Sequence, residues 1–249
     1  MRKYKDSSTQ PPRDSMSTPT HRAAGRPSGT ILTSERITEA ACRLLKKHGG
    51  FTMSSLAKEL NVAASSLYNH VDSRDEVLAN ISDHVVREIS VQPLLDAVTT
   101  LHQTNPAPGA ASILWIEATA QWARSYANAF AATPEVVAHL AITPVRRAPR
   151  TLAMYEQVVS AFIEFGFAPA HALSTVEALE AFLLGSALDA TAPADIFDPA
   201  ELSEDHPAMT AAYRELSAAH ENPAQLAFEA GLYALLGRFS ATTFGAQLI

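Results

Sequence analysis

The spacing of apolar residues along this chain predicts helices from residue 33 onward. The first stretch places Ile37, Ala40, Ala41, Leu44 and Leu45 at the i, i+3, i+4, i+7 and i+8 positions of one helix face. Gly49 and Gly50 then end the pattern, as glycine often does after the last turn of a helix. The pattern therefore predicts an amphipathic helix that packs its apolar face against the residues that follow.

A second and a third helix are predicted directly after it, around a tight turn. Thr52 is a suitable N-cap for a helix from Met53 to Leu60, because its hydroxyl can accept from the first free N–H groups. Ala57 is small enough for a third helix to approach closely, and Asn61 tolerates the left-handed conformation that such a turn requires. The shared core is expected to contain Leu56, Leu60, Val62, Leu67 and Val71.

The exposed side of the third helix is unusual for a protein surface. It presents small and hydrogen-bonding residues where a solvent-facing helix would normally carry Lys and Glu: Ala63, Ala64, Ser65, Ser66, Tyr68, Asn69 and His70. Such groups can enter the major groove of DNA and hydrogen-bond to base edges. The three helices together predict a helix-turn-helix that binds double-stranded DNA.

This segment resembles the N-terminal domain of the TetR family of transcriptional regulators. That family typically carries Leu-Tyr-x-His/Tyr-Phe/Val on its third helix, and this chain has Leu67-Tyr68-Asn69-His70-Val71. The family usually has Gly-Val in the turn, where Asn61-Val62 stands here. The resemblance covers roughly a quarter of the chain, and its N-cap, small residue, turn and Leu-Tyr pair agree with one another.

Two groups of DNA contacts are expected. Base edges are the expected partners of Ser65, Ser66, Asn69 and also His70, with the asparagine amide suited to adenine. Phosphates are the expected partners of Thr52, Ser54, Tyr68 and Arg74, which would position the protein without reading the DNA sequence. Within the TetR family, the positions of Tyr68 and His70 commonly meet the DNA backbone.

Downstream, Pro and Gly residues divide the chain into further helices. Ser73 is a suitable N-cap for a fourth, connecting helix that runs to about Ser90, after which Pro93 breaks or restarts it. No stretch after Ala110 shows the sustained alternation of a β-strand. The expected helices span residues 110–132, 134–141, 148–165, 168–190, 208–219 and 222–244.

These elements predict an all-α protein with two folded domains of unequal size. Residues 1–30 are expected to form a disordered basic tail, and residues 31–91 a helix-turn-helix DNA-binding domain with its connecting helix. Residues 92–249 are expected to form a larger C-terminal helical domain for ligand binding and dimerisation. The single cysteine, Cys42, excludes an intramolecular disulfide and is expected to be a small core residue.

Charge is distributed unevenly along the chain. Residues 1–70 contain 11 Lys and Arg against 5 Asp and Glu, whereas the remaining 179 residues contain 8 against 21 and no lysine. Attraction to phosphates is therefore confined to the N-terminal end, although the formal net charge is -7. Within the tail, Gly25-Arg26-Pro27 is similar to the minor-groove core of AT-hook segments, with Ala24 in place of their first Arg. Arg26 as a minor-groove contact and the tail as a plain linker both stay open.

Two C-terminal helices are apolar on several faces and must be covered on several sides. One contains Leu173, Val176, Leu179, Phe182, Leu183, Leu184 and Leu188, and the other contains Leu226, Phe228, Leu232, Tyr233, Leu235, Leu236 and Phe239. Gly185, Ala187, Gly231 and Gly237 would permit a second subunit to approach closely. A homodimer is favoured over buried helices of a monomer, because two-fold dimers are the commonest oligomers and match palindromic DNA sites. The resemblance to the TetR family also implies dimerisation through a four-helix bundle.

The same resemblance implies a small-molecule pocket in each C-terminal domain. The residues expected to bind the ligand are His102, Gln121, Trp122, Tyr126, Tyr155 and Phe162. Such a mixture suits a largely apolar effector with a few orienting hydrogen bonds. The alternative for each aromatic residue is an ordinary core position, and for His102 a surface position.

Catalytic and metal-binding motifs are not found in the sequence. The nine histidines include no pair at i+3 or i+4, and there is no Gly-rich phosphate loop and no GxSxG elbow. Catalytic residues, metal ligands and cofactors are therefore not expected, and an enzyme is a remote alternative. No uncharged apolar run approaches 18 residues, and the first 30 residues lack the apolar region of a signal peptide. A cytoplasmic protein without membrane contact is expected.

The sequence thus favours a ligand-responsive transcriptional regulator. A dimer would bind a palindromic operator with two recognition helices in successive major grooves. A small molecule that prefers another conformer would release it, so a repressor is the default hypothesis. The main alternative is a DNA-binding dimer without small-molecule control, whose C-terminal domain serves dimerisation or a protein partner.

Overall fold

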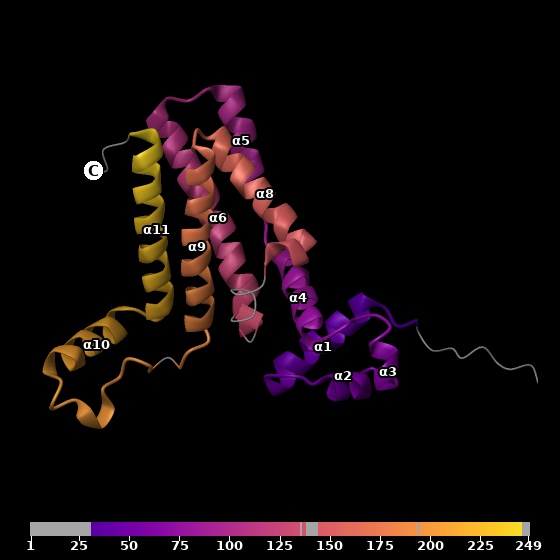
Figure 1. Ribbon diagram of the computed structural model, residues 1–249. Helices are drawn as coiled ribbons and strands as arrows, with labels where there is room; N and C mark the ends of the chain where they lie inside the picture. The colour runs from indigo at the N-terminus through magenta and orange to yellow at the C-terminus, as the bar shows by residue number, and fades with distance from the viewer. Residues whose placement is uncertain (1–30, 135, 138–143, 194, 246–249) are drawn as a thin grey trace, which may run out of the picture. The chain divides into compact units, whose positions relative to one another are not determined.

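The structure, a computed structural model, describes residues 31–134, 136–137, 144–193 and 195–245. Within these residues it contains α-helices and short 3-10 helices and no strand (Figure 1). The all-α fold class predicted from the apolar spacing is therefore confirmed. The described helices belong to one compact unit, Leu32–Ile249. The tail of residues 1–30 with Arg26, and residues 135 and 138–141 of an expected helix, lie outside the described residues.

The first three helices form the helix-turn-helix domain: α1 (Ser34–His48), α2 (Met53–Glu59) and α3 (Ala64–Leu67). Thr52 caps α2, because its hydroxyl accepts from the Ser55 N–H at 3.1 Å while the Ser55 hydroxyl accepts from the Thr52 N–H at 2.9 Å. Asn61 has a φ of 53°, the left-handed conformation predicted for it. The buried apolar residues of this domain include Ile37, Ala40, Ala41, Leu44, Leu45, Leu56, Ala57, Leu67 and Val71.

The third helix is shorter than its exposed face suggested. It ends at Leu67, and Tyr68, Asn69 and His70 lie in a turn that follows it. The His70 N–H donates to the Leu67 carbonyl at 2.9 Å, which is the i to i+3 pattern of a 3-10 turn. Tyr68 keeps a right-handed helical backbone, with φ of -68° and ψ of -8°. The candidate DNA contacts are therefore presented by one helical turn and its continuation.

Helix α4 (Arg74–Val85) leads away from the helix-turn-helix domain and is capped by Ser73, as predicted. The Ser73 hydroxyl accepts from the Glu76 N–H at 3.1 Å. Helix α4 passes into η1 (Val86–Glu88), and α5 (Gln92–Thr104) follows. Pro93 lies in the first turn of α5, where its missing N–H costs no hydrogen bond. Of the two outcomes left open by the sequence, this proline therefore restarts the helix.

The C-terminal helices match the predicted spans closely. They are α6 (Pro108–Ala131), α8 (Pro149–Glu164), α9 (Pro169–Asp189), α10 (Pro207–Ala219) and α11 (Pro223–Phe244), with η2 (Val145–Arg147) before α8 and η3 (Ala200–Leu202) before α10. Each α-helix in this set carries a proline in its first turn, where the fixed φ favours helix initiation. None of the described helices combines the length and the apolar character that a membrane crossing requires.

Helix α6 lies at the centre of the C-terminal helices. It packs against α5, α9 and α11, while α8 packs against α5 and α9 (Figure 1). Trp115, Trp122, Tyr126 and Phe130 of α6 are fully buried. The Trp115 ring meets the Phe162 ring of α8 edge to face, with centroids 5.3 Å apart. Aromatic side chains of α6 therefore contribute to the core that α6 shares with α8.

One glycine assigned to a subunit contact serves a contact inside the chain. A Cβ atom at Gly231 of α11 would lie 2.8 Å from the ring of Phe182 on α9. A larger residue at this position would require the Phe182 ring to shift. Gly237 is also buried, whereas Gly185 of α9 is exposed. Gly185 is the most exposed of the three glycines, and close approach of a second subunit at any of them stays a prediction.

Replacement of Asn61 tests the turn of the helix-turn-helix. Asn61→Val is expected to lower the free energy of unfolding by about 1–2 kcal/mol, because a β-branched side chain is strained at positive φ. Asn61→Gly, the matched control, is expected to stay within about 0.5 kcal/mol of the original chain, because glycine adopts this conformation freely. Urea denaturation followed by circular dichroism measures both values. Equal stability of the two variants would contradict the left-handed turn.

Candidate functional site

The candidate DNA contacts lie at the start of α2, on α3 and in the turn after α3. Thr52, Ser54, Ser65, Tyr68, Asn69, His70 and Arg74 are exposed, and Ser66 is half-buried. Tyr68 is 51% exposed, a large fraction for an aromatic side chain in a folded domain. Leu67, between Ser66 and Tyr68, is fully buried. The α3 segment is therefore anchored by its apolar side while its polar side chains stay accessible.

Two of the expected phosphate contacts are held in place by hydrogen bonds within the helix-turn-helix domain. The Arg74 Nε donates to the Phe51 carbonyl at 3.2 Å, and the guanidinium lies 5.1 Å from the centre of the Phe51 ring. These contacts leave the Nη groups of Arg74 to donate to a phosphate. Thr52 uses an oxygen lone pair to cap α2, so its hydroxyl hydrogen can still be donated. Both side chains are therefore positioned before DNA arrives.

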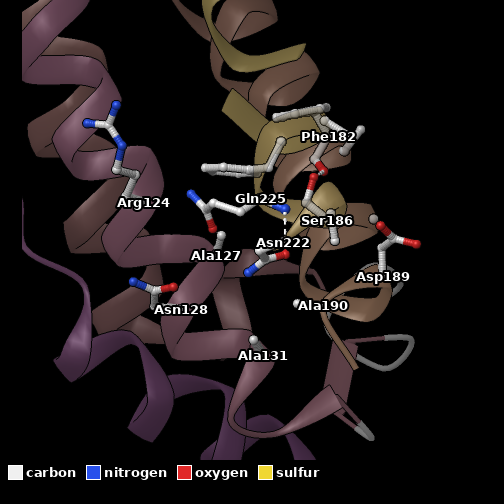
Figure 2. Close-up of a pocket in the computed structure, with 15 residues that line it drawn as sticks. Arg124, Ala127, Asn128, Ala131, Phe182, Ser186, Asp189, Ala190, Asn222 and Gln225 are labelled. Atoms are coloured by element: carbon white, nitrogen blue, oxygen red, sulfur yellow. Dashed lines mark hydrogen bonds between the residues drawn. The ribbon is translucent and has the colours of Figure 1, made fainter. Parts of the chain in front are cut away.

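A pocket of about 560 Å³ opens between α6, α9 and the first turns of α11 (Figure 2). Its apolar lining consists mainly of small residues beside two phenylalanine rings: Ala127, Ala131, Ala181, Phe182, Gly185, Ala190, Ala224, Ala227 and Phe228. Its polar lining consists of Arg124, Asn128, Ser186, Asp189, Asn222 and Gln225. This volume and mixture are typical of sites that bind small molecules.

An ion pair lies beside this pocket, between Arg124, which lines it, and Glu229. Arg124 of α6 donates from Nε and Nη2 to the two carboxylate oxygens of Glu229 on α11, both at 2.8 Å. The Tyr233 hydroxyl accepts from Arg124 Nη2 at 3.2 Å, and Gln225 Nε2 donates to Glu229 Oε1 at 3.0 Å. The hydrogen bonds from Arg124 hold the pKa of Glu229 below its ordinary value and raise the pKa of Arg124. The pair stays ionised and ties α6 to α11 beside the pocket.

A second polar cluster lies within the core formed by α6, α8 and α9. The hydroxyl oxygens of Tyr126 and Tyr155 are 3.0 Å apart, and the Tyr126 hydroxyl donates to Glu180 Oε1 at 3.3 Å. The Tyr155 hydroxyl donates to the same carboxylate oxygen. Burial raises the pKa of both tyrosines well above their ordinary value. Both hydroxyls therefore stay neutral and act as hydrogen-bond donors.

Several buried polar atoms of α6 and α9 have no hydrogen-bond partner among the described residues. They are Trp115 Nε1, Thr119 Oγ1 and Trp122 Nε1 on α6, and Thr175 Oγ1 on α9. A buried donor without an acceptor costs about 1–3 kcal/mol, so such atoms are rare in folded proteins. Their presence on one stretch of α6 indicates a core that can accept further polar partners.

The predicted ligand-binding residues do not line the open pocket. Trp122, Tyr126, Tyr155 and Phe162 are buried in the core, and His102 and Gln121 are exposed. The His102 Nε2 lies 3.0 Å from Glu164 Oε2. Contact of any of these residues with an effector stays a prediction. No group of three His, Cys, Asp or Glu side chains in the described part of the chain is placed to hold a metal ion.

The polar residues of the pocket were missed by sequence reasoning. The missed residues are Arg124, Asn128, Ser186, Asp189, Asn222 and Gln225. The sequence contained one indication of this site: Arg124 and Glu229 are each a charged residue within a mainly apolar helix, which suggests that each needs a partner. They stand 105 residues apart, so their pairing required knowledge of which helices are neighbours. The other residues follow no pattern that sequence reasoning could have used.

Comparison with known proteins identifies relatives that share this fold. A family model described as "Tetracyclin repressor-like, C-terminal domain" matches residues 105–237. ActR of Streptomyces coelicolor in complex with (S)-DNPA is 23% identical, covers 86% of this chain and 100% of its own, and superposes with a TM-score of 0.65. A possible TetR family transcriptional regulator from Streptomyces coelicolor A3(2) is 25% identical, with coverage of 84% and 99% and a TM-score of 0.62. A variant TetR from Acinetobacter baumannii AYE in complex with minocycline is 18% identical, with coverage of 85% and 98% and a TM-score of 0.58. No curated protein matches the chain at a significant level by sequence.

The buried Tyr126 and Tyr155 hydroxyls are expected to lower the free energy of unfolding at alkaline pH. An unfolded chain loses these protons near pH 10, whereas the raised folded-state pKa keeps them bound. Their contribution to stability is therefore fully present below about pH 10 and is lost as the pH rises above it. In an alkaline titration, part of the tyrosinate absorbance is expected to appear together with the loss of circular dichroism. A double variant, Tyr126→Phe with Tyr155→Phe, should lack that part, and an unchanged titration would contradict the buried cluster.

Proposed function

Because this chain belongs to the TetR family of transcriptional regulators, we propose that it is a DNA-binding regulator that a small molecule releases from a palindromic operator. The observation that carries the proposal is the anchored helix-turn-helix with exposed polar side chains on α3 and its following turn. The family model covers the C-terminal helices rather than this domain, so the two lines of support come from different parts of the chain.

The proposed DNA contacts divide by chemistry. Ser65, Ser66, Asn69 and His70 read base edges in the major groove, and Asn69 donates to and accepts from adenine. Thr52, Ser54, Tyr68 and Arg74 bind phosphates and set the position of the domain on the duplex. The exposure of Tyr68 and the fixed guanidinium of Arg74 support these roles. Arg26 of the tail is a further proposed contact, in the minor groove.

We propose that two copies of the chain pack through α9 and α11. The exposed stripe of α9 consists of Leu173, Ser174, Glu177, Ala181, Gly185 and Leu188, and that of α11 consists of Leu226, Ala227, Ala230, Tyr233 and Ala234. Ala181, Gly185 and Ala227 also line the pocket, so the pocket borders the proposed interface. Small and apolar side chains predominate in both stripes, which suits close helix packing between subunits. A dimer supplies the two helix-turn-helix domains that a palindromic operator needs.

The effector is proposed to act inside the C-terminal domain. The pocket between α6, α9 and α11 supports control by a small molecule over the alternative of a purely structural domain. Trp122, Tyr126, Tyr155 and Phe162 are proposed as further contacts, because the core around them holds buried donors without partners. ActR, which this chain resembles in fold, has been solved with (S)-DNPA and with actinorhodin. An effector that prefers another conformer of the dimer shifts the population away from DNA and relieves repression.

In vitro selection of bound duplexes from a random pool tests the operator. The original chain is expected to recover a palindrome, with half-sites about one helical turn apart or a multiple of it. A Tyr68→Ala, Asn69→Ala variant should fail to hold that palindrome, because it loses a phosphate contact and a base contact together. Fluorescence anisotropy at a stated salt concentration measures both affinities.

A variant away from the proposed contacts controls for folding in this selection. Glu156→Gln replaces an exposed carboxylate on α8 and is expected to bind the operator as the original chain does. Recovery of salt-sensitive binding without sequence preference, unchanged in the double variant, would overturn the operator hypothesis. Attention would then move to the basic tail, where electrostatic attraction needs no recognition helix.

A charged substitution on α11 tests the dimer. Ala234→Glu is expected to yield monomers, because it buries a carboxylate of each subunit in the proposed interface without a partner. The same substitution at exposed Ala218 of α10 is the matched control and should leave the dimer intact. Sedimentation velocity distinguishes the two masses. A dimeric Ala234→Glu variant would show that the chain associates through another surface.

A further inference from the structure

A single carboxylate joins α4 to the first turn of α8. Asp83 of α4 is only 8% exposed. Its Oδ1 accepts from the backbone N–H groups of Arg150 at 2.7 Å and Thr151 at 3.0 Å. Its Oδ2 lies 3.7 Å from Arg150 Nη1. Both oxygens of a buried side chain on α4 are therefore directed at the beginning of another helix.

The two N–H groups are ones that a helix cannot satisfy by itself. Helix α8 begins at Pro149, and the first N–H groups of a helix have no acceptor in the preceding turn. Ala148 occupies the N-cap position of α8 and has no side chain that could accept from them. A carboxylate also interacts favourably with the positive end of the helix dipole. Asp83 thus supplies from α4 the cap that α8 lacks.

The capped turn leads directly to the buried tyrosine cluster. Tyr155 lies one helical turn after Thr151, and its hydroxyl contacts Tyr126 of α6 and Glu180 of α9. Tyr155 and the residues that Asp83 holds therefore lie on one helix, a single turn apart. Because interiors are close-packed, a shift of α8 at Tyr155 reaches its first turn.

On its other side, α4 is bonded to the helix-turn-helix domain. Asn80 Nδ2 donates to the Ser34 hydroxyl at 3.4 Å, and Arg87, just after α4, donates to Glu35 Oε1 at 2.8 Å. Both partners lie in the first turn of α1, against which α4 packs. A displacement of α4 is therefore passed on to α1.

We propose that Asp83 is the positioning residue through which the C-terminal domain controls the helix-turn-helix domain. By capping α8 from α4, its carboxylate makes the first turn of α8 and the start of α1 move together. The inference rests on the proposed function and names the contact by which that function is regulated. Removal of the carboxylate leaves DNA contacts and effector contacts in place and weakens the link between them.

Thermodynamic linkage allows a test without an identified effector. If an effector changes operator affinity through this contact, operator binding changes effector affinity by the same factor, and the C-terminal domain therefore responds to the operator. The operator duplex obtained by selection is therefore the probe, and amide hydrogen exchange of the peptide covering residues 149–155 is the measurement. In the original chain, saturating operator is expected to change the exchange rate of this peptide by about 5-fold or more.

Two substitutions of Asp83 distinguish the effect of its charge from the effect of its hydrogen bonds to α8. Asp83→Ala removes both acceptors and is expected to keep operator binding while losing most of the exchange change in residues 149–155. Asp83→Asn keeps one oxygen acceptor without the charge, and its exchange change is expected to lie between those of the original chain and Asp83→Ala. If Asp83→Ala does not fold, Asp83→Asn is the variant that is measured. Glu88→Gln, which neutralises an exposed carboxylate after α4, is the matched control and should retain the full change.

Two outcomes would overturn the inference. One is an original chain that binds its operator with no change in exchange at residues 149–155. The other is an Asp83→Ala or Asp83→Asn variant that binds the operator and shows the full change. Failure to select any operator is a separate result, because it contradicts the proposed function before Asp83 is examined.

Discussion

The burial of α6 is the constraint on which the other features of the C-terminal helices depend. This helix is covered by α5, α8, α9 and α11, and its aromatic side chains leave little freedom in how those helices pack. The face that carries Trp122 and Tyr126 forms the closed core with α8 and α9. The face that carries Arg124 and Asn128 meets solvent between α9 and α11, where the pocket opens. One helix therefore separates a hydrogen-bonded interior from an accessible cavity, and a ligand in either place acts on the same scaffold.

Much of the fold could be predicted from the sequence, because local signals agree with one another. The N-caps Thr52 and Ser73, the left-handed Asn61 and the prolines at helix starts are all recognisable without a structure, since each acts within a few residues of chain. The face of α1 followed equally directly from its apolar spacing. Two helices departed from expectation: α3 ends at Leu67 and continues as a 3-10 turn, and α4 ends at Val85 rather than near Ser90.

The candidate sites were less predictable, since they depend on contacts between distant residues. The aromatic residues of α6 and α8 were identified, but whether an aromatic side chain fills a core or lines a cavity is decided by its neighbours. Gly231 shows the same difficulty: its small size was apparent, and its partner, the Phe182 ring, was not. The cap of α8 by Asp83 was not predicted for a similar reason, because its donors lie 67 and 68 residues further along the chain.

The cap that α8 receives from α4 also bears on how the chain folds. A helix whose first N–H groups find their acceptor on another helix is incomplete until that helix has docked. The ordered start of α8 and the docking of α4 are therefore one event, and neither the helix-turn-helix side nor the C-terminal side reaches its final hydrogen bonding alone. An exchange of either half with that of a relative that lacks this carboxylate would leave the first N–H groups of α8 without their acceptor.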